Sequence, residues 1–318
     1  MMNEITKKSI VMNSKSFEEI ALLWLEEKRQ YVKKSTYCAY SLLVNNHLKT
    51  AFVGKDVVTG DMLQQFVLKK LDQGLSHKSV KDMLVVVKMI LHYARKHDYL
   101  PPCDMEVRFP TDRRYRGIQV MSREHQKLLM EYVRDNGTYL DLGIYMCLCA
   151  GLRIGEICAL VWDDIDLESG VISISKTLQR IYVIDGEERY TEVLTGSPKS
   201  RSSIREVPLV KDLAQMLMPM KCASVGHHYV LTNSTSPMEP RAYRNYYNAL
   251  IKRLNLPRLK FHGLRHTFAT RCIESKCDYK TVSVLMGHAN VNTTLNLYVH
   301  PDMEQKKRCV ERMLDFVQ

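Results

Sequence analysis

The residues of this chain best suited to chemistry are two arginines, two histidines and one tyrosine. Arg153 stands in the middle of the chain, and His262, Arg265, His288 and Tyr298 follow in that order near its end. Arginine suits a phosphate because its planar guanidinium donates two hydrogen bonds at once. A tyrosine hydroxyl can attack phosphorus if a base or positive surroundings activate it. Together the five residues fit a phosphodiester transfer that needs no metal.

Zinc binding is an alternative chemistry for this segment. His262 and His266 are four residues apart and would share one face of a helix, as zinc-binding histidine pairs do. The glutamate of an H-E-x-x-H motif is missing, however, because Gly263 stands in its place, and no third ligand is nearby. We therefore predict neither a bound metal nor a cofactor.

Each of these residues also has an ordinary interpretation when it is taken alone. Arg153 or Arg265 could be a surface arginine, and His288 could simply follow a turn. Tyr298 lies in an amphipathic run, where a core tyrosine is common. Only the ordered combination of these residues separates the two interpretations.

The composition favours an intracellular protein with a polyanionic partner. The 318 residues carry a formal net charge of +11, which favours nucleic acid, although a basic enzyme without such a partner fits the charge equally well. Nine cysteines without a C-x-x-C pair indicate free thiols in a reducing compartment. We see no signal peptide and no apolar span of membrane length. We predict a cytoplasmic protein with no membrane contact.

The first hundred residues predict a compact bundle of four helices. Apolar residues recur at helical spacing in each segment, and the connections are short. The predicted helix starts are polar N-cap residues: Ser16, with Glu19 completing a capping box, then Ser35, Thr59 and Ser76. Pro101 and Pro102 end the last helix.

A basic linker follows the bundle. It contains Arg113, Arg114 and Arg116 between a proline and a glycine, which marks a domain boundary. We predict an N-terminal helical domain over 1–106, the linker over 107–118 and a second domain over 119–318. The linker arginines are predicted to contact phosphates, and the alternative is a solvated loop.

The second half of the chain mixes helices with a few strands. Residues 171–174 alternate like a strand, and residues 179–184 and 190–194 would form a hairpin around the turn signal Asp185-Gly186. A third short strand is predicted over 204–209, and helices follow. The predicted fold class is therefore mainly α with a small antiparallel sheet.

The ordered motifs of the chain resemble the catalytic signature of the tyrosine recombinases, also called phage-type integrases. The matching runs are Gly151-Leu152-Arg153-x-Gly155-Glu156, His262-x-x-Arg265-His266, Leu285-x-Gly287-His288 and Thr293-Thr294-x-x-x-Tyr298. Between the arginines, Ser197-Pro198-Lys199-Ser200 before Glu206-Val207-Pro208-Leu209 resembles the hairpin lysine motif of that family. The resemblance covers residues 16–318, and the helical bundle is similar to the family's core-binding domain.

The resemblance implies a role for each matching residue. Arg153 and Arg265 would clamp the scissile phosphate, and His288 would hydrogen-bond it. Tyr298 would attack phosphorus, forming a 3′-phosphotyrosyl bond and releasing a 5′-hydroxyl. Lys199 would be the general acid that protonates this leaving oxygen.

Two further roles and the energetics follow from the same resemblance. His262 would serve as a base or proton relay, and Glu156 would support the arginines. The phosphotyrosine stores the energy of the broken bond, and rejoining therefore requires neither ATP nor a metal.

The implied activity is site-specific recombination through a Holliday junction, integrating or excising a mobile element. The implied partners are double-stranded DNA with specific sites and, in the synapse, three more copies of the chain. Accessory DNA-bending or excision factors are further candidate partners. The alternatives are a chromosome-dimer resolvase of the same family, a type IB topoisomerase-like enzyme and a catalytically silent DNA-binding protein.

Three regional features refine this interpretation. Only some fifteen residues precede the first predicted helix, so we expect either no arm-site binding or a truncated chain. The hairpin between residues 176 and 196 is long, which favours a mobile-element integrase. The tail over 303–318 is amphipathic, with Val310, Met313, Leu314 and Val317 on one side, and could dock on a neighbouring subunit or on its own domain.

Overall fold

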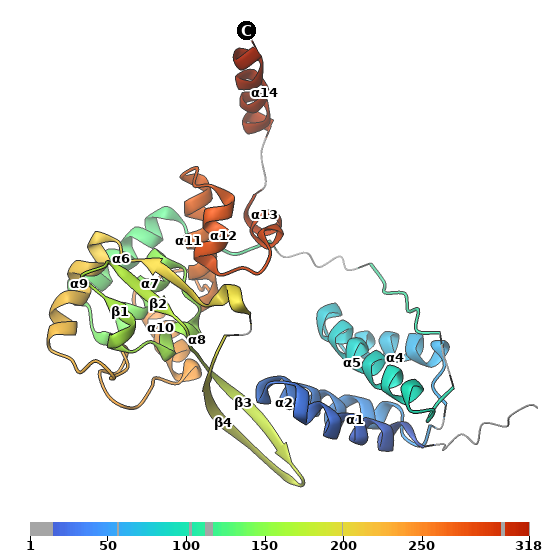
Figure 1. Cartoon of the computed structure of the whole chain (residues 1–318). Helices are drawn as coiled ribbons and strands as arrows, with labels where there is room; N and C mark the ends of the chain where they lie inside the picture. Colours follow the sequence, from blue (N-terminus) through green and yellow to red (C-terminus); the bar gives the residue numbers. More distant parts are fainter. Residues whose placement is uncertain are drawn as a thin grey trace, which may run out of the picture. The chain divides into compact units, whose positions relative to one another are not determined.

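The computed structural model describes residues 15–55, 57–101, 104–111, 117–198, 200–299 and 303–317 (Figure 1). Its backbone contacts divide the chain into two compact units. The first unit comprises residues 1–115 with residues 181–192, and the second comprises residues 116–180 and 193–318. Four residues predicted to be functional, Arg113, Arg114, Arg116 and Lys199, lie outside the described residues.

The first unit is built on a bundle of helices. Its elements are α1 (Phe17–Tyr31), α2 (Lys34–Leu43), the π-helix η1 (Val44–Leu48), α3 (Lys49–Ala51), α4 (Gly60–Asp72) and α5 (His77–Lys96). Three predicted N-caps are confirmed, because the hydroxyls of Ser16, Thr59 and Ser76 each accept a backbone N–H of the first turn. Glu19 completes the capping box with Ser16.

The predicted cap at Ser35 is wrong. Helix α2 begins two residues earlier than a cap at Ser35 would place it, at Lys34, and Lys33 occupies the N-cap position without a side-chain hydrogen bond. Ser35 therefore lies inside the first turn, where its hydroxyl cannot cap the helix. At the other end of α2 the chain widens into η1, where the Asn45 amide donates to the Ser41 carbonyl over 2.8 Å.

The core of the bundle is aromatic at its centre. Phe17, Trp24 and Phe52 are almost fully buried, and Phe66 lies beside them. The ring centroids of Phe17 and Phe52 are 4.7 Å apart, and those of Phe52 and Phe66 are 5.3 Å apart. Tilted aromatic contacts at such distances add stabilisation beyond the area that they bury. These aromatic rings belong to the one hydrophobic cluster that the described helices of the bundle share.

The described strands form two small antiparallel sheets. One sheet, in the second unit, has the order β1-β2-β5, with Ile172 opposite Val207. The other is the long hairpin β3-β4, whose outer part, residues 181–192, belongs to the first unit. The hairpin turns at Asp185 and Gly186, as predicted, and Gly186 has a φ of 58°. The strands are β1 (Ile165–Asp166), β2 (Val171–Ile174), β3 (Thr177–Asp185), β4 (Glu188–Gly196) and β5 (Arg205–Pro208).

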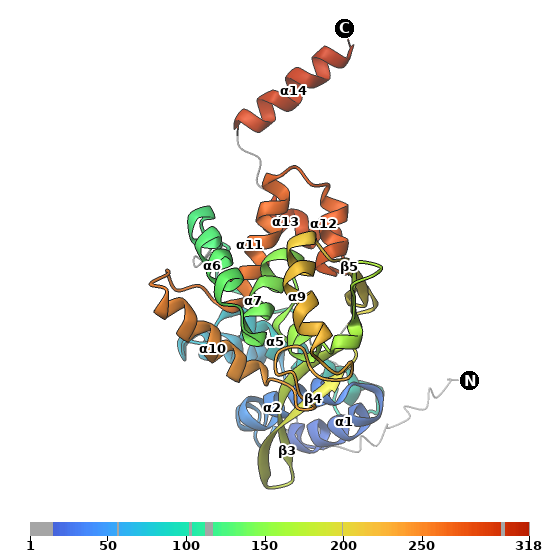
Figure 2. The same ribbon diagram turned by 90° about the vertical axis from the view of Figure 1, so that its left-hand side faces the viewer.

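Helices surround helix α7 in the second unit (Figure 2). Nearly every side chain of α7 is buried, because its twelve residues are almost all apolar. The Thr138–Asp141 capping box begins this helix. The helices are α6 (Arg123–Asn136), α7 (Tyr139–Ala150), α8 (Ile154–Ala159), η2 (Trp162–Asp164), η3 (Arg201–Ser203), α9 (Lys211–Cys222), α10 (Pro240–Arg253), α11 (Phe261–Glu274), α12 (Tyr279–Met286), α13 (Val291–Tyr298) and α14 (Met303–Val317).

The predicted fold class is confirmed. Helices dominate both units, and the strands form only small antiparallel sheets. Within the described ranges, no helix is both long enough and apolar enough to cross a membrane.

Candidate active site

A glycine turn between α7 and α8 positions the first arginine. Gly151 ends α7 in the left-handed region, with a φ of 64°. A Cβ at this position would lie 2.5 Å from a ring carbon of Phe268, so a side chain is excluded both by conformation and by space. The turn places Arg153 at the N-cap of α8, where its guanidinium reaches the Glu156 carboxylate over 2.7 Å.

Three arginines from different elements meet at the C-terminal end of α12. Each donates to one of three successive backbone carbonyls at this end: Arg205 to Leu285 over 2.7 Å, Arg265 to Met286, and Arg153 to Gly287 over 3.1 Å. Free carbonyls carry the negative end of the helix dipole and favour positive charge nearby. These contacts fix the backbone immediately before His288.

Glu156 is the carboxylate at the centre of this cluster. It is 2% exposed and accepts hydrogen bonds from both terminal nitrogens of Arg205, over 3.1 and 3.0 Å. It also accepts the hydrogen bond from Arg153. Burial by itself raises the pKa of Glu156, but Arg205 and Arg153 outweigh it and hold that pKa below its usual value. The carboxylate is therefore ionised and supports two guanidinium groups.

Arg205 is a site residue that the sequence interpretation missed. Its side chain is 5% exposed and bridges β5, α8 and the end of α12. The available signal was its place in the Arg205-Glu206-Val207-Pro208 run, directly after the lysine motif. A local pattern could not show that its side chain turns inward.

Arg265 lies deeper than the other arginines, with 2% of its surface exposed. It occupies α11 and donates to the carbonyls of Gly151 and Met286. Burial, followed by the charge of Arg153, lowers its pKa to about 9. Arg153 and Arg205 thus pair with the carboxylate of Glu156, whereas Arg265 donates to backbone carbonyls, and the cluster has an excess of positive charge. An anion is the ligand that would balance it.

Two histidines lie at the edge of the cluster. His288 follows the left-handed Gly287, and its Nδ1 is 2.9 Å from the Thr294 hydroxyl. Burial, with the charges of Arg265 and Arg153, lowers its pKa to about 4. His262 stands in the first turn of α11 with part of its ring open to solvent, and burial of the rest also lowers its pKa. Both rings are therefore neutral at neutral pH.

Tyr298, at the end of α13, is buried against Phe268, Val282 and Met286. Its hydroxyl lies 2.6 Å from Nδ1 of His266. Burial raises its pKa to about 12, although Arg265 and Arg153 act in the opposite direction. The hydroxyl is therefore protonated and requires a base before it can attack.

The structure brings together the described members of the predicted site. The charges of Arg153 and Arg265 influence His262, His288 and Tyr298. Lys199 and the three linker arginines are outside the described ranges and cannot be placed. In the part of the chain that the structure describes, no group of three or more His, Cys, Asp or Glu side chains gathers as a metal site.

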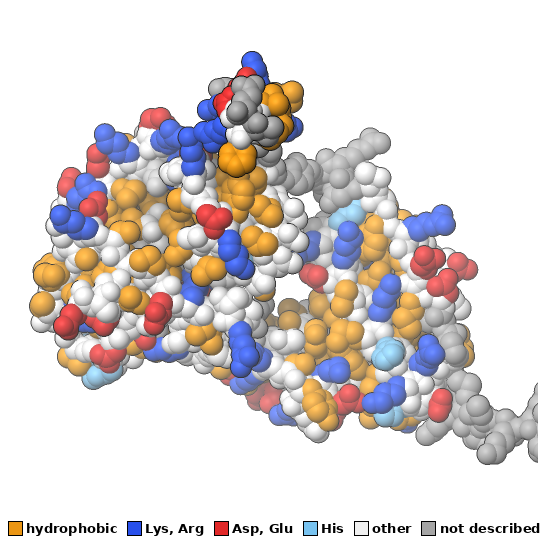
Figure 3. Space-filling model, turned by 45° about the horizontal axis from the view of Figure 1, so that its top comes forward, with side chains coloured by type: hydrophobic (Ala, Val, Ile, Leu, Met, Phe, Trp, Pro, Cys, Tyr) orange, Lys and Arg blue, Asp and Glu red, His pale blue; other side chains and the backbone are white. Residues whose placement is uncertain are grey.

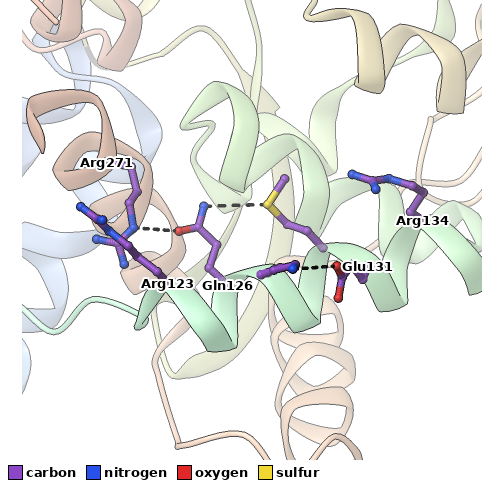
Figure 4. A pocket seen from close by; sticks show the side chains of 7 residues that line it. Arg123, Gln126, Glu131, Arg134 and Arg271 are labelled. Carbon is purple, nitrogen blue, oxygen red and sulfur yellow. Dashed lines mark hydrogen bonds and ion pairs between the residues drawn. The ribbon is translucent and has the colours of Figure 1, made fainter. Parts of the chain in front are cut away.

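A separate pocket on the second unit lies between α6 and α11, the helix that carries His262 and Arg265 (Figure 4). Arg271, near the end of α11, donates to Gln126 of α6 over 3.0 Å and to the Met121 carbonyl over 2.6 Å. Other cations at this pocket are paired, Arg123 with Glu274 and Lys127 with Glu131. We infer that these contacts hold α11 in place.

The chain has a helical bundle followed by a mixed domain, in which arginines, histidines and a buried tyrosine meet. This combination defines the class of tyrosine recombinases, which are enzymes that cleave and rejoin DNA. The chain belongs to the phage integrase family, whose model matches residues 119–305. A second model, the phage integrase N-terminal SAM-like domain, matches residues 16–57. The resemblance drawn from the sequence is confirmed.

Relatives from several bacteria align with nearly the whole chain. It is 29% identical to an XerC-like tyrosine recombinase of Caldanaerobacter subterraneus subsp. tengcongensis, covering 92% of this chain and 81% of the relative. It is 24% identical to the ICEBs1 integrase of Bacillus subtilis, over 96% and 84% of the two chains. The Tn1549 transposon integrase, solved with circular-intermediate DNA, is 22% identical, has a TM-score of 0.75 and covers 94% of this chain and 100% of that one. This structural likeness shows a shared fold.

Proposed function

We propose that this recombinase integrates and excises a mobile DNA element at specific sites, through a 3′-phosphotyrosyl intermediate and a Holliday junction. The observation that supports this best is the excess of guanidinium charge around Glu156, of which Arg265 and Arg153 act on the Tyr298 hydroxyl. Its relatives include the ICEBs1 integrase and the transposase from transposon Tn916, which favours a mobile element over chromosome-dimer resolution.

The chemical roles that we propose are those implied by the resemblance to the family, and the positions of the described site residues support them. Arg153 and Arg265 bind the non-bridging oxygens of the scissile phosphate and stabilise the charge that grows there. Tyr298 attacks phosphorus, and Lys199 protonates the leaving 5′-oxygen. His288, placed by the three arginine–carbonyl contacts, donates a hydrogen bond to the phosphate.

Two other residues support this chemistry. Glu156 keeps Arg153 and Arg205 oriented and ionised. His262 is proposed as a proton relay, because its ring meets the His266 ring edge-on, with centroids 4.6 Å apart. No metal or other cofactor takes part in the proposed reaction.

Contacts to DNA are proposed for the bundle and the linker. Helix α5 exposes Lys78, Lys81, Arg95 and Lys96. On the face of the bundle turned to the viewer in Figure 3, basic side chains are spread among apolar ones. We propose that this helix and the linker residues Arg113, Arg114 and Arg116 contact phosphates. In this proposal the helical domain covers residues 1–106, the linker covers 107–118 and the catalytic domain covers 119–318.

We propose a tetramer as the active assembly, working on two DNA sites in the cytoplasm. Helix α14 exposes Val310, Met313 and Leu314, with about half of each side chain open to solvent. Exposed apolar stripes of this kind mark partner surfaces. Accessory factors that bend DNA or direct excision are expected to act alongside the tetramer.

The experiment is an excision assay on a DNA carrying two copies of the attachment site that flanks this gene. The proposal predicts a circular product with one joined site, formed without ATP and in the presence of EDTA. Relaxation of supercoiled DNA without any joined site would instead support the topoisomerase alternative. Binding with no strand cleavage would support a silent DNA-binding protein.

A further inference from the structure

We propose that His266 is the catalytic residue that takes the proton from Tyr298 when DNA is cleaved and returns it when DNA is rejoined. The proposal rests on the assignment of Tyr298 as the nucleophile. From the sequence, His266 receives no catalytic role: it is half of a possible zinc-binding pair with His262 and part of one matching motif. The structure gives it a different neighbour.

The geometry joins His266 directly to the oxygen that would react. Nδ1 of His266 lies 2.6 Å from the Tyr298 hydroxyl, within the range of a short hydrogen bond. The two rings are tilted by 52°, with centroids 5.7 Å apart. His266 is on α11 and Tyr298 on α13, so the contact depends on the packing of two helices that are distant in sequence.

The other two histidines of the site are occupied differently. Nδ1 of His288 is paired with the Thr294 hydroxyl. His262 meets the ring of His266, and His266 stands between it and the tyrosine. Of the three, His266 is the one that forms a hydrogen bond with Tyr298 in the described structure.

The electrostatic surroundings suit a base at this position. Burial and the charge of Arg265 lower the pKa of His266, so its ring is neutral and can accept a proton. Tyr298, with a pKa raised to about 12, does not ionise by itself at neutral pH. A neutral imidazole with its proton on Nε2 offers Nδ1 as the acceptor.

The proposed step balances in both directions. During cleavage, the Tyr298 O–H bond breaks, its proton passes to Nδ1, and the phenolic oxygen forms a bond to phosphorus. The bond from phosphorus to the 5′-oxygen breaks, and this oxygen receives a proton from the general acid, the role proposed for Lys199. During rejoining, the 5′-hydroxyl returns its proton to the same general acid and its oxygen bonds to phosphorus. The bond from phosphorus to the phenolic oxygen breaks, and the imidazolium of His266 protonates the departing Tyr298.

The test compares two variants that differ in what they can do with the tyrosine. His266→Asn places an amide near the position of Nδ1, where it can accept a hydrogen bond but cannot take a proton. His266→Ala removes both functions. The matched control is His227→Asn, an exposed histidine in the loop between α9 and α10. All four proteins, including the wild type, react with a nicked suicide substrate, and the covalent adduct is followed in single-turnover kinetics.

The proposal predicts that both His266 variants form the adduct about 100- to 10,000-fold more slowly, as is typical when a general base is lost. DNA binding should be unchanged, the control should react normally, and added imidazole should accelerate His266→Ala. A near wild-type rate for His266→Asn would overturn the proposal, because the residue would then only hold the tyrosine. If His266→Ala does not fold, the rate of His266→Asn decides alone.

A parallel reaction with Tyr298→Phe separates this proposal from the one on which it rests. If Tyr298→Phe still forms the adduct, Tyr298 is not the nucleophile, and both proposals fail. If Tyr298→Phe is inactive and His266→Asn is fast, only the role of His266 is refuted.

Discussion

At the scale of the residue, Arg205 shows how excess positive charge is held inside the catalytic domain. Its guanidinium is bound to Glu156 and to a carbonyl at the end of α12. Leaving one partner of a buried ion pair unpaired costs about 3 to 5 kcal/mol. Without Arg205, Glu156 would keep only the partly exposed Arg153 as its ion-pair partner. We therefore predict that Arg205→Met lowers the free energy of unfolding by at most about this amount, measured by urea denaturation.

The matched control for this prediction is the double variant Arg205→Met with Glu156→Gln. It also removes the carboxylate charge that has lost its more buried partner, and it should recover part of the lost free energy of unfolding. If Arg205→Met alone unfolds at the wild-type urea concentration, the buried pair does not support the site.

A second prediction at this scale concerns Lys199, for which the expected role is general acid. Lys199→Ala should slow cleavage of ordinary DNA about 100- to 10,000-fold. A substrate with sulfur in place of the bridging 5′-oxygen should react at nearly the wild-type rate, because sulfur leaves without protonation. The rates of covalent adduct formation on the two substrates provide the measurement. Equal defects on both would show that Lys199 only binds DNA.

At the scale of the element, α11 and the turn after α12 hold neutral histidines, and this links stability to pH. The pKa of His288 is lowered to about 4, and those of His262 and His266 are also lowered. The unfolded chain takes up these protons near pH 6.5, before the folded chain does. The resulting stability is present above pH 6.5 and is lost as the pH falls toward 4.

We therefore predict that the urea midpoint decreases between pH 7 and pH 5. His288→Asn, which cannot titrate, should decrease less over the same range. His227→Asn, a change at an exposed loop histidine, serves as the control. If the wild type and His288→Asn lose the same stability, the burial of His288 does not contribute to the pH dependence.

The elements that could be predicted are those with local signals. Ser16, Thr59 and Ser76 begin helices because a hydroxyl can cap the adjacent turn, and Asp185-Gly186 forms the hairpin turn that its backbone preference demands. The prediction of Ser35 as an N-cap was wrong because a helix can begin without a side-chain cap. The contact of His266 with Tyr298 could not be predicted, because it depends on the packing of α11 against α13.

At the scale of the whole molecule, the tail is the part expected to join subunits. Deleting residues 303–318 should leave the binding of one protomer to one site unchanged, because α14 carries none of the residues of the candidate active site. The deletion should greatly reduce the amount of tetramer on paired sites. It removes the exposed side chains of Val310, Met313 and Leu314, which are proposed to bind a neighbouring subunit. Gel shifts on single sites and light scattering on paired sites measure the two effects. Tetramers of normal abundance without the tail would refute this role.

The most direct test of the account asks which atom becomes joined to DNA. The protein is trapped on a nicked suicide substrate, digested with a protease, and the peptide bound to DNA is sequenced by mass spectrometry. The account predicts that DNA is attached to Tyr298 and that Tyr298→Phe binds the same DNA but forms no adduct. Attachment at another residue, or an adduct that persists in Tyr298→Phe, would contradict it.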